Sequence, residues 1–219
     1  MWLLMLLREL PRRFGRLLGT IIAPPSLMSF GSFVYWMHAL LWYTFDLFAG
    51  PEVCQILLRL ATDTRPLTEA EIAAAAEVLG PNAIRYRDVS IAQGGILTTI
   101  FGLNGGRAFA TWHTINMPKG KDRNQALLVH ELIHTYQFER VGSIYIGQGL
   151  WVQRKFGRKA YDYGGPAGLL ASWAAGKHYK DYNREQQGQI AQDFCTLVIS
   201  DRETAAYEPF IAELRQGLV

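Results

Sequence analysis

The chain of 219 residues has little cysteine and little net charge. Its two cysteines, Cys54 and Cys195, are too few for a disulfide-dense scaffold or for a zinc site made of four cysteines. The net charge of +3 gives no indication of nucleic-acid binding. Gly-rich phosphate loops, tandem repeats and low-complexity tracts are also missing. With 49% hydrophobic and 19% charged residues, the chain can form a core, which excludes a wholly disordered protein.

Charged side chains are missing from residues 17–45, although Arg8, Arg12, Arg13 and Arg16 crowd the segment before them. Pro24 and Pro25 interrupt this stretch, and residues 26–45 have about the length of a membrane-spanning helix. In such a span the arginines would stay in the cytoplasm and the rest of the chain would emerge on the far side, in a bacterium the periplasm. A Cys54–Cys195 disulfide is permitted there.

The same stretch also suits a buried helical hairpin that covers the rest of the protein, because it contains polar residues such as Ser32 and His38. It lacks the basic start and the small-residue cleavage site of a secretory signal peptide. We predict a hydrophobic helical region over residues 1–55, associated with a membrane, and a second domain over residues 56–219.

The second domain has the pattern of an α+β protein, with one helix, a small β-sheet and then further helices. A capping box, Thr68 with Glu71, predicts the start of the first helix. Asn104-Gly105 predicts a β-hairpin turn. A helix over residues 123–140 is expected to start at Asp122, with Gln125 three residues later. The predicted strands cover 83–91, 96–101 and 107–116, and the other predicted helices cover 67–79, 143–153, 167–175, 184–199 and 202–216.

The helix predicted at 123–140 contains the pattern H-E-x-x-H, formed by His130, Glu131 and His134. Histidines four residues apart lie on one face of a helix, where both imidazoles can bind one Zn²⁺. Glu131 lies beside that face, so its carboxylate can act as general base and take a proton from a water molecule that zinc polarises. The surrounding residues are apolar, so two imidazoles there need a partner.

A catalytic zinc site requires a third protein ligand, and three residues after the motif are candidates. Glu139 lies five residues after His134, which turns it away from the metal-binding face. The residues alone do not decide whether His178 or Glu185 is the third ligand. Glu185 opens the next helix, where it also suits the helix dipole and follows a possible N-cap at Asn183.

Several of these motifs also occur together in one known family. Residues 67–192 resemble the Vgr-related and Rhs-associated metallopeptidases of bacteria, which are similar to a peptidase-like domain found near contractile injection systems. The resemblance implies a zincin-like fold, with zinc on His130, His134 and Glu185 and with Glu131 as the base. The matching segments are RPLTEAE (65–71), VLGPNAI (78–84), TINMP (114–118), LVHELIHTYQ (128–137), YDY (161–163) and YNREQQGQI (182–190).

In one respect the chain departs from well-known glutamate-zincins, which often have an Asp four residues after the ligand Glu to orient a histidine. That position is Gln189 here, whose carbonyl can accept the same hydrogen bond, and the acid comes later, at Asp193. A donor to the oxyanion is also needed, and our candidate is Tyr182; the other donors considered are Tyr161, Tyr163 and His178. His113, on the strand before the metal helix, could face the cleft.

These observations predict a membrane-associated zinc metallopeptidase that cleaves a peptide or protein substrate. The expected setting is the bacterial envelope or a secretion or injection system. The alternative is a non-catalytic protein of such an assembly that uses the metal to stabilise its fold or to bind a partner. A membrane-active toxin is a third possibility that the hydrophobic region leaves open. No nucleic-acid partner is expected.

Overall fold

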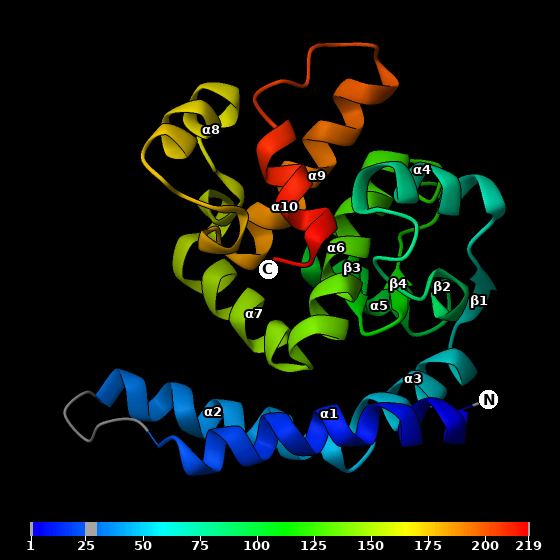
Figure 1. Ribbon diagram of the computed structural model, residues 1–219. Coiled ribbons are helices and arrows are strands. Elements are labelled where there is room, and N and C mark those ends of the chain that lie inside the picture. Colours follow the sequence, from blue (N-terminus) through cyan, green and yellow to red (C-terminus); the bar gives the residue numbers. More distant parts are fainter. Residues whose placement is uncertain (1, 25–29, 219) are drawn as a thin grey trace.

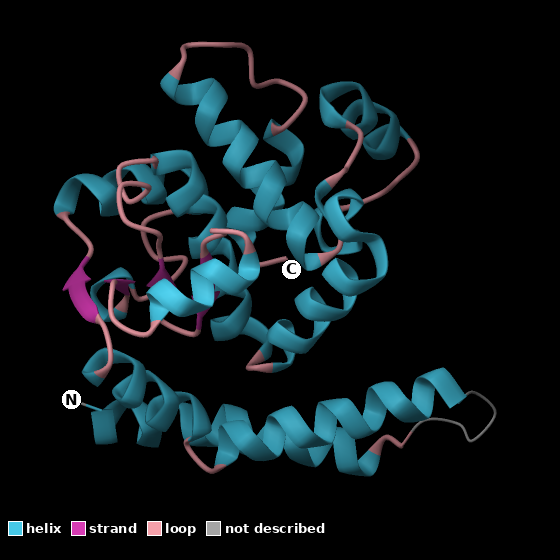
Figure 2. Ribbon diagram, turned by 180° about the vertical axis from the view of Figure 1, so that it is seen from behind, coloured by secondary structure: helices cyan, strands magenta, loops and turns pink. Residues whose placement is uncertain are grey.

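The computed structural model describes residues 2–24 and 30–218, and these residues form a mostly helical α+β protein (Figures 1 and 2). An N-terminal layer of three helices lies beneath a larger body made of the remaining elements. The N-terminal layer comprises α1 (Trp2–Ile22), α2 (Phe30–Leu47) and α3 (Gly50–Leu60). The helices of the body are α4 (Glu69–Leu79), α5 (Leu97–Asn104), α6 (Gln125–Val141), α7 (Ile144–Phe156), α8 (Gly165–Ala174), α9 (Arg184–Ile199) and α10 (Glu208–Gln216).

The strands of the described residues form one small mixed sheet in the order β1-β2-β4-β3. β1 (Asp63–Pro66) is antiparallel to β2 (Ser90–Gln93), β2 is parallel to β4 (Thr114–Asn116), and β4 is antiparallel to β3 (Phe109–Thr111). Ile91 pairs with Ile115 across the two central strands, and both side chains are fully buried. The sheet therefore supplies one side of the core against which α6 packs. Single 3₁₀ turns complete the body: Tyr86–Asp88, Gly157–Tyr161 and Tyr179–Asp181.

The capping box predicted at the start of the first body helix is confirmed. The Thr68 side chain accepts a hydrogen bond from the Glu71 backbone N–H, and the Glu71 carboxylate accepts one from the Thr68 backbone N–H. The start predicted for the metal helix is wrong by two residues, because Asn124 rather than Asp122 caps α6. The last helix begins at Glu208 rather than near residue 202.

The prediction of strands was wrong in three places, one of them the predicted strand 107–116, which a turn divides into β3 and β4. Residues 97–104 form helix α5, and Gly105 ends it in a left-handed conformation, so Asn104-Gly105 is a helix terminus rather than a hairpin turn. Residues 86–88 form a 3₁₀ turn inside the predicted strand 83–91. The hairpin turn lies at Trp112-His113, between β3 and β4, with Trp112 at φ +56°. Three hydrogen bonds hold Trp112 there: its N–H and indole donate to Tyr145 and Ser143, and its carbonyl accepts from Thr135.

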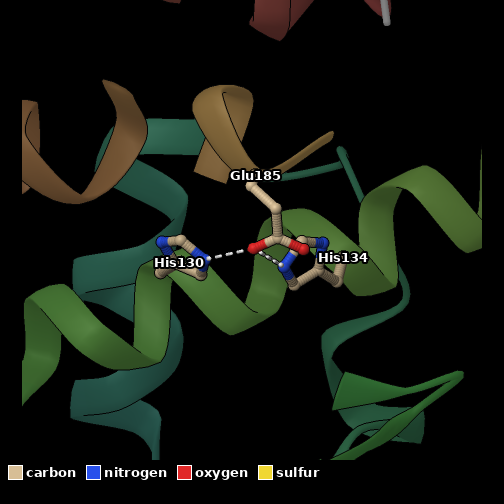
Figure 3. A group of neighbouring side chains, drawn as sticks. All are labelled: His130, His134 and Glu185. Carbon is tan, nitrogen blue, oxygen red and sulfur yellow. Dashed lines mark ion pairs between the residues drawn. The ribbon is translucent and has the colours of Figure 1, made fainter. Parts of the chain in front are cut away.

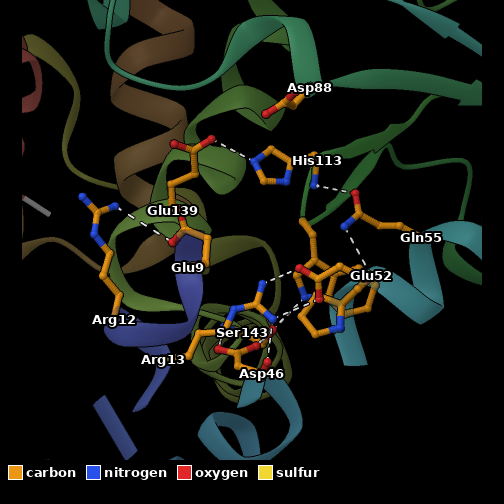
Figure 4. A network of polar contacts seen from close by, with 12 residues as sticks. Glu9, Arg12, Arg13, Asp46, Glu52, Gln55, Asp88, His113, Glu139 and Ser143 are labelled. Atoms are coloured by element: carbon orange, nitrogen blue, oxygen red, sulfur yellow. Dashed lines mark hydrogen bonds and ion pairs between the residues drawn. The ribbon is translucent and has the colours of Figure 1, made fainter. Parts of the chain in front are cut away.

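Buried polar contacts join the N-terminal layer to the body (Figure 4). Asp46 of α2 is fully buried and accepts hydrogen bonds from the backbone N–H of Ser143, at 2.9 Å, and from its hydroxyl. Burial raises the pKa of Asp46, and these bonds from Ser143 oppose that rise. Arg85 of the body donates to Glu9 of α1 at 2.6 Å. The described helices of the N-terminal region thus pack on the body through their polar residues, while many of their apolar side chains stay exposed.

The structure bears on three further expectations: the membrane span, the disulfide and the domain boundary. Residues 25–29, the start of the predicted span, lie outside the described residues. Within the described part of the chain, no helix combines the length and the hydropathy that crossing a membrane requires. The two cysteines are free thiols, Cys54 on α3 and Cys195 in the core of the body. The predicted boundary between residues 55 and 56 falls inside α3.

Candidate metal centre

Helix α6 carries the H-E-x-x-H residues into the centre of the body. Asn124 caps its start by accepting a hydrogen bond from the Leu127 backbone N–H, and Gly142 ends it. Apolar residues of the helix pack into the main core, which fixes the helix against the sheet. His130 and His134 lie one turn apart on one face, with ring centroids 5.2 Å apart. Both imidazoles are buried.

Helix α9 brings Glu185 to the two histidines (Figure 3). Asn183 caps this helix in a capping box with Gln186, which places Glu185 in the first turn. One carboxylate oxygen, Oε2, lies 3.7 Å from Nε2 of His130 and 3.7 Å from Nε2 of His134. Glu185 is 3% exposed, so the three side chains meet in an almost fully enclosed position. The structure thus brings together His130, His134 and Glu185.

Two glycines allow the helices to approach the site closely. A Cβ atom at Gly188 of α9 would lie 2.8 Å from the His130 ring, and a Cβ at Gly149 of α7 would lie 3.0 Å from Oε1 of Glu185. Any larger residue at Gly188 would displace His130, since real Cβ atoms do not approach that closely. Sequence reasoning missed both positions. The E-Q-Q-G motif does place Gly188 one helical turn after Glu185, on the same face of the helix, and so could have indicated the close approach.

The donor set fits a metal ion such as Zn²⁺. Three ligand atoms, two imidazole nitrogens and one carboxylate oxygen, lie within 4.8 Å of one another. Ligands at about 2.0–2.1 Å from zinc in tetrahedral geometry are about 3.3 Å apart, so only a small inward movement would complete the site. Among the described residues, no fourth His, Cys, Asp or Glu joins the group. Three protein ligands with one position left for water are typical of catalytic zinc sites.

The charges of the three side chains depend on one another. Burial alone would lower the pKa of His134, but the Glu185 carboxylate outweighs it and raises that pKa to about 9. Burial likewise opposes ionisation of Glu185, yet the two imidazoles hold its pKa well below the usual range. Without a metal, the site therefore holds a proton on His134 at neutral pH. A metal cation binds in place of that proton.

Glu131 lies beside the histidines and is 3% exposed. Burial raises the pKa of its carboxyl group, an effect that the two neighbouring imidazoles and the backbone N–H of Ala110 partly oppose. One of its oxygens, Oε2, has no hydrogen-bond partner. A carboxylate with a raised pKa and an unpaired oxygen is suited to accept a proton.

Gln137 orients one ligand of the site. Its Oε1 lies 2.9 Å from Nδ1 of His134, which leaves Nε2 of that ring directed at Glu185. Its Nε2 donates to Gln187 at 2.8 Å, so the amide itself is fixed. Gln189, the residue predicted to accept from an imidazole, instead donates to Asp193. The last turn of the H-E-x-x-H-x-x-Q pattern, rather than α9, thus supplies the orienting group.

We expect Gln137→Leu to weaken zinc binding by about 10–100-fold, because His134 would lose the acceptor that fixes its tautomer and ring orientation. Competition with a chromophoric chelator would measure the affinity. Gln189→Leu is the matched control and should bind zinc like the wild type, since its amide does not contact the imidazoles. Equal losses in both variants would contradict the assignment of Gln137.

A cleft of about 450 Å³ opens on the metal centre. His130, Glu131, His134 and Glu185 line it together with residues of β3, α5 and α7. Tyr161 also lines it, with its ring centroid 5.9 Å from that of His130 and its hydroxyl accepting a hydrogen bond from Nε2 of Gln153. Burial, and then the Glu185 charge, raise the pKa of Tyr161, so its hydroxyl keeps its proton. Four residues were considered as oxyanion donors, and of these Tyr161 lines the cleft.

The structure does not bring Tyr182 to the metal centre. Its ring packs against Phe210 in the core, with the centroids 5.6 Å apart. Tyr182 therefore lies where it stabilises the fold, and the oxyanion role predicted for it has no geometric support. A tyrosine so close to Glu185 in sequence can still point away, because it precedes the N-cap of α9 in an extended conformation.

The other candidates have partners elsewhere. His178 is paired with Glu213 at 2.5 Å, and the Tyr163 hydroxyl donates to Asp193. Glu139 faces away from the metal centre, as predicted, and lies 2.8 Å from His113. His113 belongs to the hairpin turn and contacts Phe138 and Glu139, so it does not line the cleft.

Comparisons with protein-family models, with curated proteins and with solved structures find no match for this chain. The resemblance to the Vgr-related family therefore stays a prediction. The structure itself supports a buried His-His-Glu group on α6 and α9 that could hold a metal ion.

Proposed function

We propose that this protein is a zinc-dependent metallopeptidase of the zincin type. The observation that carries the proposal is the position of Glu185, which lies 3.7 Å from both imidazoles of the H-E-x-x-H motif although it comes from a different helix. His130, His134 and Glu185 would hold the ion, which when bound supplies a Lewis acid that activates water and polarises a carbonyl.

The remaining groups of the cleft have complementary tasks in this proposal. Glu131 takes the proton of the attacking water and passes it to the leaving amine. The hydroxyl of Tyr161, kept protonated by its surroundings, donates to the oxyanion that develops on the substrate carbonyl. The burial of the ligand side chains strengthens these electrostatic interactions.

Strand β3 forms the edge of the sheet that borders the cleft, which suits an extended peptide substrate. Ala110 already uses its backbone N–H with Glu131 and its carbonyl with Tyr145. Ala108, which precedes β3, also lines the cleft and is the position where a peptide would pair. Ile146 and Leu150 of α7 lie across the cleft and offer an apolar surface to a substrate side chain.

The proposal is tested by offering the zinc-loaded full chain a mixture of peptides of diverse sequence and identifying new termini by mass spectrometry. We expect cleavage that stops when a chelator removes the metal and returns when zinc is added. Cleavage that persists in the metal-depleted protein would indicate a contaminating peptidase. A zinc-loaded, folded protein that cleaves no peptide would favour the non-catalytic alternative, in which the metal stabilises the fold.

A further inference from the structure

The N-terminal layer is built with its polar side toward the body. On α1 the side chains that face inward are polar and charged, including Glu9, Arg13 and Arg16. Arg13, only 3% exposed, donates to Glu52 at 3.0 Å and to the Asp46 carbonyl at 2.6 Å. An amphipathic helix at the surface of a protein normally buries its apolar face. Helix α1 does the opposite.

The outer side of α1 is correspondingly apolar. Five of its exposed apolar side chains recur every three or four residues and are between 39% and 56% exposed: Leu7, Leu10, Phe14, Leu18 and Ile21. A sixth, Ile22, is 72% exposed. Between residues 7 and 22, the only exposed side chains of α1 that can form hydrogen bonds are those of Arg8 and Arg12. The rest of this exposed arc consists of apolar residues, proline and glycine.

Helices α2 and α3 repeat the arrangement. On α2 the exposed apolar side chains are Phe33, Val34, Met37 and Leu41, beside the exposed polar residues Ser32, Tyr35 and Thr44. On α3 the exposed apolar side chains are Val53, Ile56, Leu57 and Leu60. Gln55 of α3 instead points inward, where it accepts a hydrogen bond from the backbone N–H of His113. α1 and α2 lie side by side under the body in both views (Figures 1 and 2). The exposed apolar side chains of α1, α2 and α3 therefore belong to one layer at one end of the molecule.

We propose that this outer face of α1–α3 binds a lipid bilayer with anionic headgroups, with the helices lying in the plane of the membrane interface. The charges point to this occupant. The acids of residues 1–60 are Glu9, Asp46 and Glu52, and all three are turned toward arginines of the layer or the body. The charged side chains exposed on α1 are cationic, Arg8 and Arg12, of which Arg12 also lies 4.0 Å from the inward-facing Glu9 (Figure 4).

A bilayer fits this face better than a protein partner does. Protein interfaces of stable complexes form about one hydrogen bond per 100–200 Å². The outer arc of α1 offers two arginines and no other side chain for that purpose. An interfacial helix needs only an apolar face for the acyl chains and basic residues for the headgroups, both of which are present. The membrane binding proposed here involves no metal and does not rest on the peptidase proposal.

The test is sedimentation of the full chain with vesicles of phosphatidylcholine, with and without phosphatidylglycerol. We expect the protein to bind the anionic vesicles more tightly, and salt to weaken that binding. The triple variant Leu10→Ser, Phe14→Ser, Leu18→Ser should bind about 1,000-fold more weakly, because each large apolar side chain withdrawn from the acyl region costs a factor of about ten. Arg8→Gln and Arg12→Gln should each lower binding about fivefold, and only on anionic vesicles.

The matched control replaces three exposed apolar residues of the body, Leu103, Leu170 and Ile199, by serine and should bind like the wild type. Thermal unfolding followed by circular dichroism shows whether each variant is folded. A wild-type protein that does not sediment with either kind of vesicle overturns the proposal, and so does an equal loss in the control. A lipid-free dimer that the α1 variant converts to a monomer would assign the face to self-association instead.

Discussion

Glu131→Gln should lower the rate of peptide cleavage by about 10²–10⁴-fold while the metal content and the unfolding temperature stay close to those of the wild type. The amide has the shape of the carboxylate but cannot accept a proton from water, so the variant loses the general base alone. Glu131 is not one of the three ligands, which is why the metal should remain bound. Steady-state cleavage of the best peptide from the mixture, together with elemental analysis, measures both quantities.

The same substitution elsewhere on α6 provides the control. Glu139 is also largely enclosed and paired with a histidine, but it lies outside the cleft, so Glu139→Gln should keep the activity per folded molecule. If Glu131→Gln cleaves as fast as the wild type, Glu131 is not the base. If both variants lose activity equally, the loss reports a disturbed α6 rather than missing chemistry.

The second large effect should come from removing one of the metal-binding side chains, which should abolish tight zinc binding. We expect His130→Ala and Glu185→Ala each to weaken zinc binding by more than ~100-fold, because loss of a mere orienting partner already costs about 10–100-fold. Wild-type protein should carry about one zinc per chain, and the variants close to none after dialysis. Glu185→Ala is the more decisive of the two, since it tests whether α9 contributes the third ligand.

The control for ligand removal is His178→Ala. His178 is also a histidine paired with a buried glutamate, Glu213, but it is remote from the cleft, so this variant should retain its zinc. Retention of zinc by Glu185→Ala would exclude a three-ligand site made with this residue.

Zinc affinity should also depend on pH. The pKa of His134 in the metal-free site is about 9, so below that value the metal must displace a proton. Each unit of pH below about 9 should then lower the apparent affinity about tenfold. Titration of zinc at several pH values measures this slope. An affinity that stays constant from pH 9 downward would show that His134 is already neutral without the metal.

The sequence predicted the parts of the site that depend on one helix, and it did not predict the parts that depend on how two helices pack. The pair His130 and His134 could be placed on one face because helical geometry alone determines their spacing. The choice between His178 and Glu185 could not be made from the residues, since it depends on how α9 packs on α6. Gly188 allows that packing, and its effect becomes visible only when both helices are present. Gln137 acts over three residues of one helix and was within reach of the sequence.

In the fold, too, local features were predicted from the sequence and features that depend on distant partners were not. The capping box of Thr68 and Glu71 is local and was predicted correctly. The hairpin was misplaced because Asn104-Gly105 serves equally well as a helix end, whereas Trp112 takes its left-handed conformation from partners on α6 and α7. The uncharged stretch predicted a membrane span or a buried hairpin. It did not reveal that α1 turns its charged side inward, since the partners of those charges, such as Arg85, lie far along the chain.

The bond between Asp46 and Ser143 has a consequence for biosynthesis. These residues are separated by 97 positions, and a ribosome adding about 5–20 residues per second needs about 5–20 s to make the intervening chain. During that interval Asp46 has no Ser143 to bond, and the charged side of α1 has no Arg85 for part of it. The N-terminal helices therefore cannot reach their final arrangement while they are the only segment synthesised. A nascent chain in this state exposes both its apolar and its charged faces. Exposed apolar surface of this kind is what chaperones and membrane surfaces bind until the body has folded.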